Sequence, residues 1–148
     1  MIGFETYLRL PLRVNLQYFK LFVNHTFNNY SYMSKVEEFN EYRSLMNDKI
    51  VGSNNKIIKR IFNLDTNAFT AGAVDKVTKE MIGLSTSMVL RCDDCVKYHL
   101  SKCYELGVTE EQVFEVFSIA NLIGGTIVIP HLRRAVEYWE ALKESGEK

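Results

Sequence analysis

The sequence predicts an all-α fold of about five or six helices, and three observations lead to this prediction. Apolar residues recur at the i, i+3 or i+4, i+7 spacing of an amphipathic helix in every long segment after residue 33. Two capping-box patterns and a well-placed glycine mark helix ends. No segment in this part makes a convincing core strand.

The first 32 residues differ in character from the rest of the chain. They are rich in aromatic residues and asparagine, and Glu5 is their only acid. Apolar and polar residues alternate from Leu8 to Leu16, which is a strand-like period, but Pro11 interrupts it. The segment lacks the apolar stretch and cleavage site of a secretory signal. We therefore expect residues 1–32 to be an appendage to a helical domain over residues 33–148.

The N-terminal half of this domain is expected to hold three helices. Ser34 and Glu37 form a capping box, which predicts where the first helix begins. A second, short helix is expected over residues 55–62. Apolar residues at helical spacing then predict a third helix: Val74, Val77, Met81, Leu84 and Met88.

The C-terminal half continues with a cysteine-containing helix, for which Gly107 suits the C′ stop. Thr109 and Gln112 form a second capping box. The helix that follows is expected to bury Val113, Phe114, Phe117 and Ala120. A last helix places Leu132, Ala135, Val136 and Trp139 on one face, with Pro130 at a kink or in its first turn.

The Gly124–Gly125 pair is expected to let another backbone approach closely. It lies within IANLIGGTIVIP, a segment that is apolar over a wide arc. Because monomers rarely expose large apolar patches, we expect some of this surface to meet another subunit rather than serve only an intrachain helix crossing.

Composition narrows the class of protein. The 148 residues suggest one domain, and a formal net charge of zero argues against a nucleic-acid partner. No apolar run approaches the roughly 20 residues of a membrane span. Three cysteines, two of them in one short motif, do not form a disulfide scaffold. A cytoplasmic protein with reactive or metal-binding thiols is expected.

The motif LRCDDCVKYHL, residues 90–100, carries the candidate chemistry. At ~100° per residue, Cys92, Cys95, His99 and Cys103 fall on one stripe of a helix. The helix start stabilises a thiolate, and His99 lies one turn after Cys95, where it could take a thiol proton. Cys103 is expected to pack in the core.

Glu80 is the candidate orienting group for His99. If the chain turns near Arg91 and the two helices pack antiparallel, the positions of Glu80 and His99 along the helix axis differ by only ~4–5 Å. On one continuous helix, Glu80 would be too far away and the relay would need a partner subunit.

Glu80, eleven intervening residues and then C-x-x-C-x-x-x-H resemble the alkylhydroperoxidase D-like branch of the carboxymuconolactone decarboxylase family. The segment LGVTEEQVFEVFSIANLIGGTIVIPHLRRA is similar to the helical continuation in small members. The resemblance implies an all-α fold that assembles into trimers or hexamers. It also implies reduction of a small hydroperoxide, with Cys92 and Cys95 cycling through a disulfide and Glu80 and His99 completing the catalytic set.

We expect that an external dithiol reductant regenerates the cysteine pair and that no metal, flavin or haem is required. We expect Cys95 to attack and Cys92 to resolve, while the reverse order stays open. Asp94 departs from the family, in which a histidine often precedes the second cysteine. An acid at this position would raise a thiol pKa.

Three other functions stay open. C-x2-C-x3-H-x3-C offers four candidate zinc ligands, but a continuous helix spreads Cys92 and Cys103 over ~16 Å. Decarboxylation of a lactone acid needs no second thiol. The chain could also be a non-catalytic or redox-sensing assembly module. His25 and His131 lack partners at informative spacing and receive no catalytic role, and Tyr98 is expected to point away from the stripe and to pack.

Overall fold

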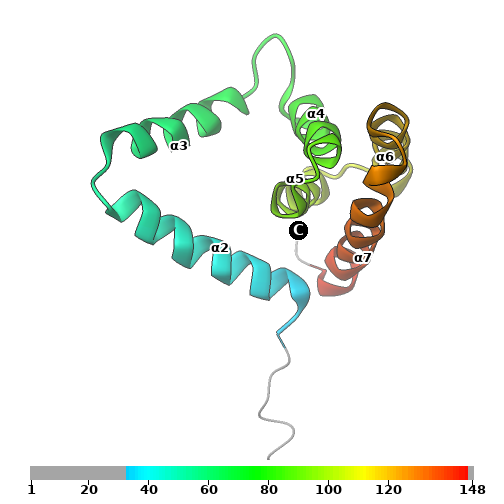
Figure 1. Ribbon diagram of the computed structural model, residues 1–148, viewed down its shortest axis with the longest axis horizontal. Helices are drawn as coiled ribbons and strands as arrows, with labels where there is room; N and C mark the ends of the chain where they lie inside the picture. Colours follow the sequence, from blue (N-terminus) through cyan, green and yellow to red (C-terminus); the bar gives the residue numbers. More distant parts are fainter. Residues whose placement is uncertain (1–32, 147–148) are drawn as a thin grey trace, which may run out of the picture. The chain divides into compact units, whose positions relative to one another are not determined.

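The computed structural model describes residues 33–146, which form six α-helices, one short 3-10 helix and no strand (Figure 1). The helices are α2 (Lys35–Gly52), α3 (Lys56–Ala68), α4 (Lys76–Val89), α5 (Asp93–Glu105), α6 (Glu110–Gly124), η1 (Thr126–Val128) and α7 (Ile129–Ser145). The all-α prediction is confirmed for these residues. The expected N-terminal appendage, residues 1–32, lies outside the described residues, so its boundary stays a prediction.

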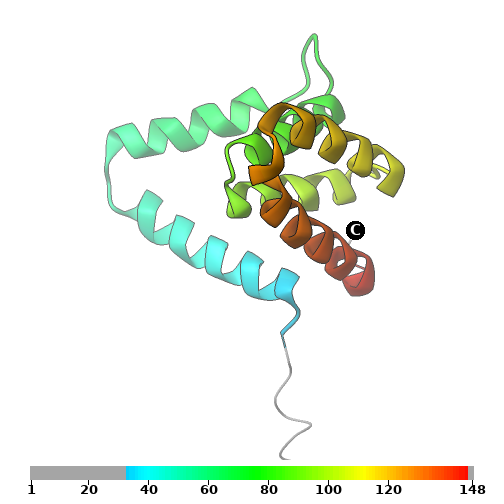
Figure 2. The ribbon, with the colours of Figure 1, turned by 45° about the vertical axis from the view of Figure 1, so that its right-hand side comes forward.

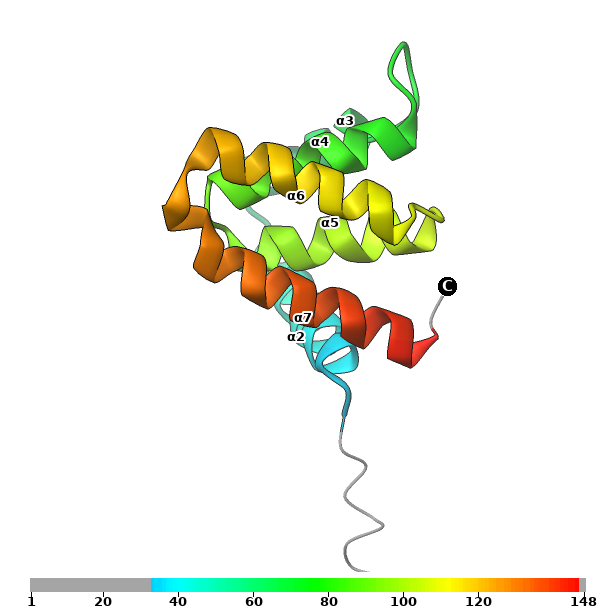
Figure 3. The same cartoon turned by 90° about the vertical axis from the view of Figure 1, so that its right-hand side faces the viewer.

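The hydrophobic core lies among α4, α5, α6 and α7, with one end of α2 added to it. Helix α4 packs on α5 and α6, and α7 runs along α5, as the two rotated views show (Figures 2 and 3). Fully burying a large apolar side chain contributes about 1.5–3 kcal/mol. The largest fully buried apolar side chains are Trp139, Phe117, Leu84, Met88, Leu100, Val36, Val113 and Val128.

Helices α2 and α3 form a hairpin that packs on the rest mainly through α2. The capping box of α2 is confirmed: the Glu37 N–H donates to Oγ of Ser34 at 3.1 Å. Helix α3 buries none of its residues and ends at Ala68, six residues beyond the predicted end. The reason is that the apolar spacing of Ile57, Ile61 and Leu64 continues past residue 62.

A tight turn joins α4 to α5, as predicted near Arg91. Arg91 has φ 58°, in the left-handed region, and its N–H donates to the Met88 carbonyl at 3.0 Å. The Cys92 N–H donates to the Ser87 carbonyl at 3.1 Å, which completes a Schellman motif. Cys92 then serves at once as the N-cap of α5. Two helix ends therefore fix the backbone of this one cysteine.

The predicted stop of α5 is confirmed by a second Schellman motif. Gly107 has φ 77°, and the Val108 N–H donates to the Cys103 carbonyl at 3.0 Å. The capping box of Thr109 and Gln112 at the start of α6 is also confirmed. The predicted burial of Phe114 is wrong: 41% of this residue is exposed, because it lies about 100° around the helix from buried Val113.

Gly124, the last residue of α6, and Gly125, its C-cap, shape the connection to α7. Gly125 adopts φ 75° and ψ −173°, a conformation that is essentially restricted to glycine. A Cβ on Gly124 would collide with Cγ2 of Val128 and lie 3.7 Å from Cα of Val89, so the predicted close approach of another backbone is confirmed. Pro130 lies in the first turn of α7. The apolar side chains around the glycines still point outward: Ile119, Leu122, Ile123 and Ile127 are exposed.

No helix within residues 33–146 combines the length and apolar character that crossing a bilayer requires.

Candidate functional site

A buried carboxylate–imidazole pair lies between α4 and α5. Nδ1 of His99 is 2.8 Å from Oε2 of Glu80, and the two residues are only 8% and 1% exposed. The antiparallel hairpin brings them together as the sequence predicts. When Nδ1 carries the hydrogen and donates it to Glu80, Nε2 of the ring is left as the basic nitrogen.

Gly83 makes the room that the imidazole occupies, and sequence reasoning missed it. A methyl group at this position would stand 2.5 Å from Cε1 and 2.8 Å from Nδ1 of His99. Such approaches are far inside van der Waals contact. The only available signal was a glycine inside the helical pattern one turn after Glu80, which indicates a packing or functional reason.

Aromatic rings flank the imidazole on two sides. The ring centroids of Phe69 and Tyr98 lie 5.1 Å and 5.2 Å from that of His99. The expectation that Tyr98 points away from the reactive stripe is therefore wrong, although it does pack, with the Arg43 guanidinium 4.0 Å from its ring centroid. Apolar and aromatic walls strengthen the Glu80–His99 interaction because they exclude water from it.

Lys79 fixes the loop that carries Phe69. Its Nζ donates to the carbonyls of Ala68 and Thr70 at 2.8 Å and 2.6 Å, and so satisfies the C-terminal end of α3. A cavity of about 360 Å³ opens beside this loop. It is lined by Asp65, Thr66, Phe69, Thr70, Ala71, Lys76, Glu80, Tyr98 and Lys102.

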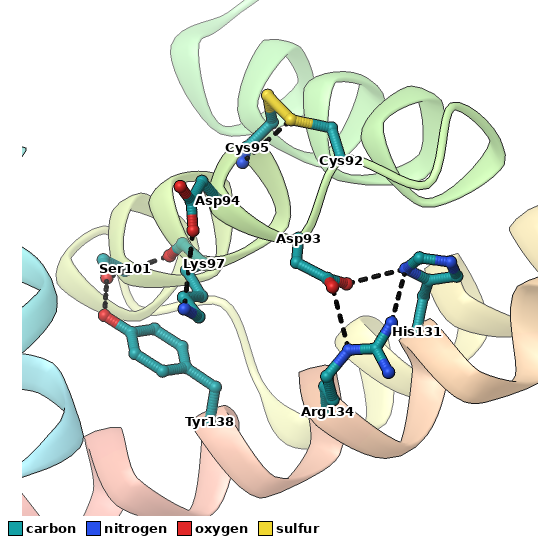
Figure 4. A network of polar contacts seen from close by, with 9 residues as sticks. All are labelled: Cys92, Asp93, Asp94, Cys95, Lys97, Ser101, His131, Arg134 and Tyr138. Carbon is teal, nitrogen blue, oxygen red and sulfur yellow. Dashed lines mark hydrogen bonds and ion pairs between the residues drawn. A yellow bond between two sulfur atoms is a disulfide. The ribbon is translucent and has the colours of Figure 1, made fainter.

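Cys92 and Cys95 are joined by a disulfide across the first turn of α5, with 5.3 Å between their Cα atoms (Figure 4). The Cys95 N–H also points at Sγ of Cys92, at 3.4 Å. Cys95 is exposed, whereas Cys92 is half-buried. Because both cysteines lie at the start of α5, the pair sits at the positive end of the helix dipole, where a reduced sulfur is stabilised as thiolate.

The sulfur pair and the Glu80–His99 pair are neighbours along α5. Cys95 and His99 are four residues apart on one continuous helix and so lie on the same face, one turn apart. Within residues 33–146, no hydrogen bond joins the imidazole to either sulfur of the disulfide. Chemically, such an arrangement can supply a sulfur pair that interconverts between dithiol and disulfide, a nitrogen base, and a carboxylate that orients the base.

Cys103 does not join this chemistry. It is fully buried, and burial, helped by the charge of Glu80, raises the pKa of its thiol to about 12. The prediction that it packs in the core is confirmed. Because α5 is continuous, Cys92 and Cys103 lie near its opposite ends, and no three His, Cys, Asp or Glu residues in the described part of the chain are grouped to hold a metal ion.

The two acids between the cysteines have different surroundings. The Asp94 side chain is 70% exposed and lies 3.5 Å from Nζ of Lys97, so solvent and a cation both screen it. Asp93 instead points toward α7, where His131 and Arg134 contact its carboxylate (Figure 4). Sequence reasoning gave His131 no partner, because the two residues are 38 positions apart and no periodicity links them.

Comparison with known proteins gives a consistent result. The family model "Carboxymuconolactone decarboxylase family" matches residues 56–138, more than half of the chain. A crystal structure of a family member from Thermotoga maritima has a TM-score of 0.70 and 46% identity, and covers 75% of this chain and 97% of that one. A family protein from Legionella pneumophila, in its apo form, has a TM-score of 0.64 and 26% identity, and covers 76% of this chain and 98% of that one.

Two curated relatives match over shorter stretches. An uncharacterized protein of Cupriavidus necator is 32% identical over 71 residues, which are 48% of this chain and 63% of that protein. Alkyl hydroperoxide reductase AhpD of Corynebacterium kroppenstedtii is 39% identical over 62 residues, which are 42% of this chain and 36% of the reductase. The chain thus spans less than two thirds of either relative.

Proposed function

Because this chain belongs to the carboxymuconolactone decarboxylase family, we propose that it is a thiol-dependent oxidoreductase that reduces small hydroperoxides. The observation that carries the proposal is the buried Glu80–His99 pair one helical turn from the exposed Cys95 of a disulfide pair. The relative called alkyl hydroperoxide reductase supports it. So does the description of the Thermotoga protein as a candidate for the antioxidative response.

The first step uses Cys95 and His99. Nε2 of His99 takes the Cys95 thiol proton, and the carboxylate of Glu80 stabilises the imidazolium through Nδ1–H. The thiolate attacks the outer oxygen of the hydroperoxide, the O–O bond breaks, and the leaving alkoxide takes the proton from the imidazolium. Cys95 becomes a sulfenic acid while the hydroperoxide is reduced to an alcohol.

The second step forms the disulfide that the structure contains. The Cys92 sulfur attacks the sulfenic sulfur of Cys95, the S–O bond breaks, and hydroxide leaves as water with the Cys92 thiol proton. Two electrons from two thiols have then reduced one hydroperoxide to alcohol and water. An external dithiol returns both electrons and both protons by thiol–disulfide exchange, which requires a reducing compartment such as the cytoplasm.

The exposure of the two sulfurs supports the assigned order. The exposed Cys95 is the accessible target for peroxide and for the external reductant. When a reductant attacks Sγ of Cys95, Cys92 leaves as a thiolate, and the Cys95 N–H that points at its sulfur stabilises that charge. Cys92 is therefore suited to be the resolving and leaving thiol.

We propose further that the chain works as a homo-oligomer, a trimer or a hexamer. Large apolar side chains are exposed on α3 and around the end of α6, including Ile57, Ile61, Leu64, Leu122 and Ile123. Exposed apolar faces of this kind are the usual sign of a subunit interface. Leu122 is 84% exposed, and contact between such a large apolar side chain and water is unfavourable.

Peroxide turnover by three variants tests the proposal. With an external dithiol and an alkyl hydroperoxide, Cys95→Ser should abolish peroxide consumption. Cys92→Ser should perform one turnover and leave a sulfenic acid on Cys95 that a sulfenic-acid-specific reagent labels. The matched control Cys103→Ser should retain the wild-type rate, because the Cys103 thiol is buried and inert. If wild-type protein consumes no peroxide, the proposal fails, and a lactone-turnover assay would then separate decarboxylase from assembly module.

A further inference from the structure

Three side chains form a polar clamp between α5 and α7, which we call the Asp93 clamp: Asp93, His131 and Arg134. Nδ1 of His131 is 2.7 Å from Oδ1 of Asp93, and Nε of Arg134 donates to Oδ2 at 2.8 Å. Nη2 of Arg134 lies 2.9 Å from Nδ1 of His131, so all three groups touch one another. Both carboxylate oxygens of Asp93 are thereby engaged from the same helix.

The clamp holds the residue that directly follows Cys92. Asp93 is the first residue of α5, and Cys92 before it is the N-cap. Its side chain turns toward α7 and not toward the disulfide (Figure 4). Because Asp93 directly follows Cys92, any change in the position or pairing of this carboxylate occurs one residue from the reactive sulfur pair.

A carboxylate near a thiol ordinarily opposes ionisation of that thiol. A like charge within about 4–6 Å raises a thiol pKa. Partial burial would raise the pKa of Asp93, but the hydrogen bonds and charges of His131 and Arg134 outweigh it and hold that pKa below its usual value. Asp93 therefore stays ionised at neutral pH, and its charge is balanced by the guanidinium of Arg134.

In the part of the chain that the structure describes, no ion pair joins Asp93 to any residue besides His131 and Arg134. On its own helix, Asp94 and Lys97 lie 3.5 Å apart and offset each other. From α7, the groups that face Asp93 are His131 and Arg134 themselves. Arginine suits such a pairing because its planar guanidinium is always charged.

We propose that His131 and Arg134 are positioning residues that act through Asp93 on the dithiol. They hold the Asp93 carboxylate paired and turned toward α7, so that its charge does not oppose thiolate formation at Cys92 and Cys95. This inference deepens the proposed function and rests on the reactive role of the two cysteines. It assigns to His131 and Arg134 a role that their distance along the chain conceals.

The test is alkylation of the reduced full-length chain by iodoacetamide, whose rate follows the thiolate fraction. At about pH 7, Arg134→Gln should slow alkylation of Cys92 and Cys95 roughly 3- to 10-fold, because an uncompensated Asp93 raises their pKa. Arg134→Lys should restore part of the rate, and His131→Leu should slow it less than Arg134→Gln. Arg133→Gln, the same change at the neighbouring exposed arginine, is the matched control and should have no effect.

The deciding comparison uses Asp93→Asn as background. If Arg134 acts through Asp93, adding Arg134→Gln to Asp93→Asn should leave the alkylation rate unchanged. An equal slowing in both backgrounds would show that the guanidinium acts on the sulfurs directly, and no slowing in either would show that it does not act at all; both results overturn the proposal. If Arg134→Gln does not fold, Arg134→Lys in the two backgrounds decides the same question. Alkylation needs no peroxide, so this outcome is independent of whether the chain reduces one.

Discussion

Glu80 is the single residue on which the proposed proton transfer depends most. Glu80→Gln keeps the shape of the side chain and can still accept from Nδ1–H of His99, but it removes the charge that stabilises the imidazolium. We expect the rate of peroxide reduction to fall roughly 10²-fold with the fold intact. Steady-state peroxide consumption measures it, with Glu105→Gln at an exposed position of α5 as control. Equal rates for Glu80→Gln and wild type would remove the relay from the mechanism.

Gly83 provides a second test of the same pair. Gly83→Ala places a methyl group 2.5 Å from Cε1 of His99, so the imidazole must shift away from Glu80. We expect activity to fall at least as far as in Glu80→Gln. The free energy of unfolding should fall by about 0–2 kcal/mol, because overpacking costs about 1–3 kcal/mol while alanine recovers about 1 kcal/mol of helix propensity. The control is Gly52→Ala, where a Cβ meets nothing within 4 Å, and retained activity in Gly83→Ala would contradict the geometry.

Cys103 should behave differently from the other two thiols. Burial raises the pKa of its thiol to about 12, above the ordinary 9.0, so it stays protonated at neutral pH. A thiol reagent added to reduced native protein should react rapidly with Cys92 and Cys95 only, and with Cys103 only after denaturation. The stabilising effect of burying the neutral thiol should be complete below pH 9.0 and disappear as pH rises toward 12. Rapid reaction of all three thiols in the native state would refute the burial.

At the scale of the residue, local signals were predictable and distant ones were not. Helix geometry alone places the two cysteines one turn apart and brings Glu80 to the same position along the helix axis as His99, so both features could be predicted from the sequence. The contacts of Asp93 with His131 and Arg134 join residues 38 and 41 positions apart, and only the packing of α5 on α7 brings them together. Gly83 likewise reveals its role only when its neighbour across the helix pair is known.

At the scale of the element, the two Schellman motifs that end α4 and α5 are the most informative features. Gly107 and Arg91 occupy the same left-handed position in them, with φ 77° and 58°. Gly107→Ala should destabilise the chain by about 1 kcal/mol, because a Cβ is strained in that region. The melting temperature should fall by roughly 3–5 °C.

Arg91→Gly is the matched opposite change. It relieves about 1 kcal/mol of the same strain but gives the unfolded chain more freedom, so the melting temperature should remain close to wild type. Thermal unfolding of both variants in the reduced state is the measurement. If Arg91→Gly lowers the melting temperature as much as Gly107→Ala does, the left-handed turn before Cys92 would be contradicted.

Helix boundaries were predictable where a side chain caps the backbone within one turn. The capping boxes at Ser34 and Thr109 and the stop at Gly107 all depend on contacts three to five residues apart. The end of α3 has no such stop, and its polar residues after Phe62 hid the continuing pattern of Ile57, Ile61 and Leu64. Phe114 shows a second limit of sequence-based prediction, because an apolar residue within a helix need not lie on its buried face.

At the scale of the whole molecule, the proposed oligomer explains why apolar side chains at the end of α6 face outward. We expect the full chain to be a trimer or hexamer by light scattering after size-exclusion chromatography. Leu122→Glu should shift it to smaller species, because a charge would be buried without a partner. The control Leu122→Met keeps the apolar contact and should keep the oligomer. A monomeric wild-type chain would contradict the interface.

The most direct measurement of the central claim counts thiols before and after one equivalent of an alkyl hydroperoxide. The reduced chain should lose two thiols per hydroperoxide, and peptide mapping should place the new disulfide between Cys92 and Cys95, with Cys103 still free. An unchanged thiol count, or a disulfide that includes Cys103, would contradict the account.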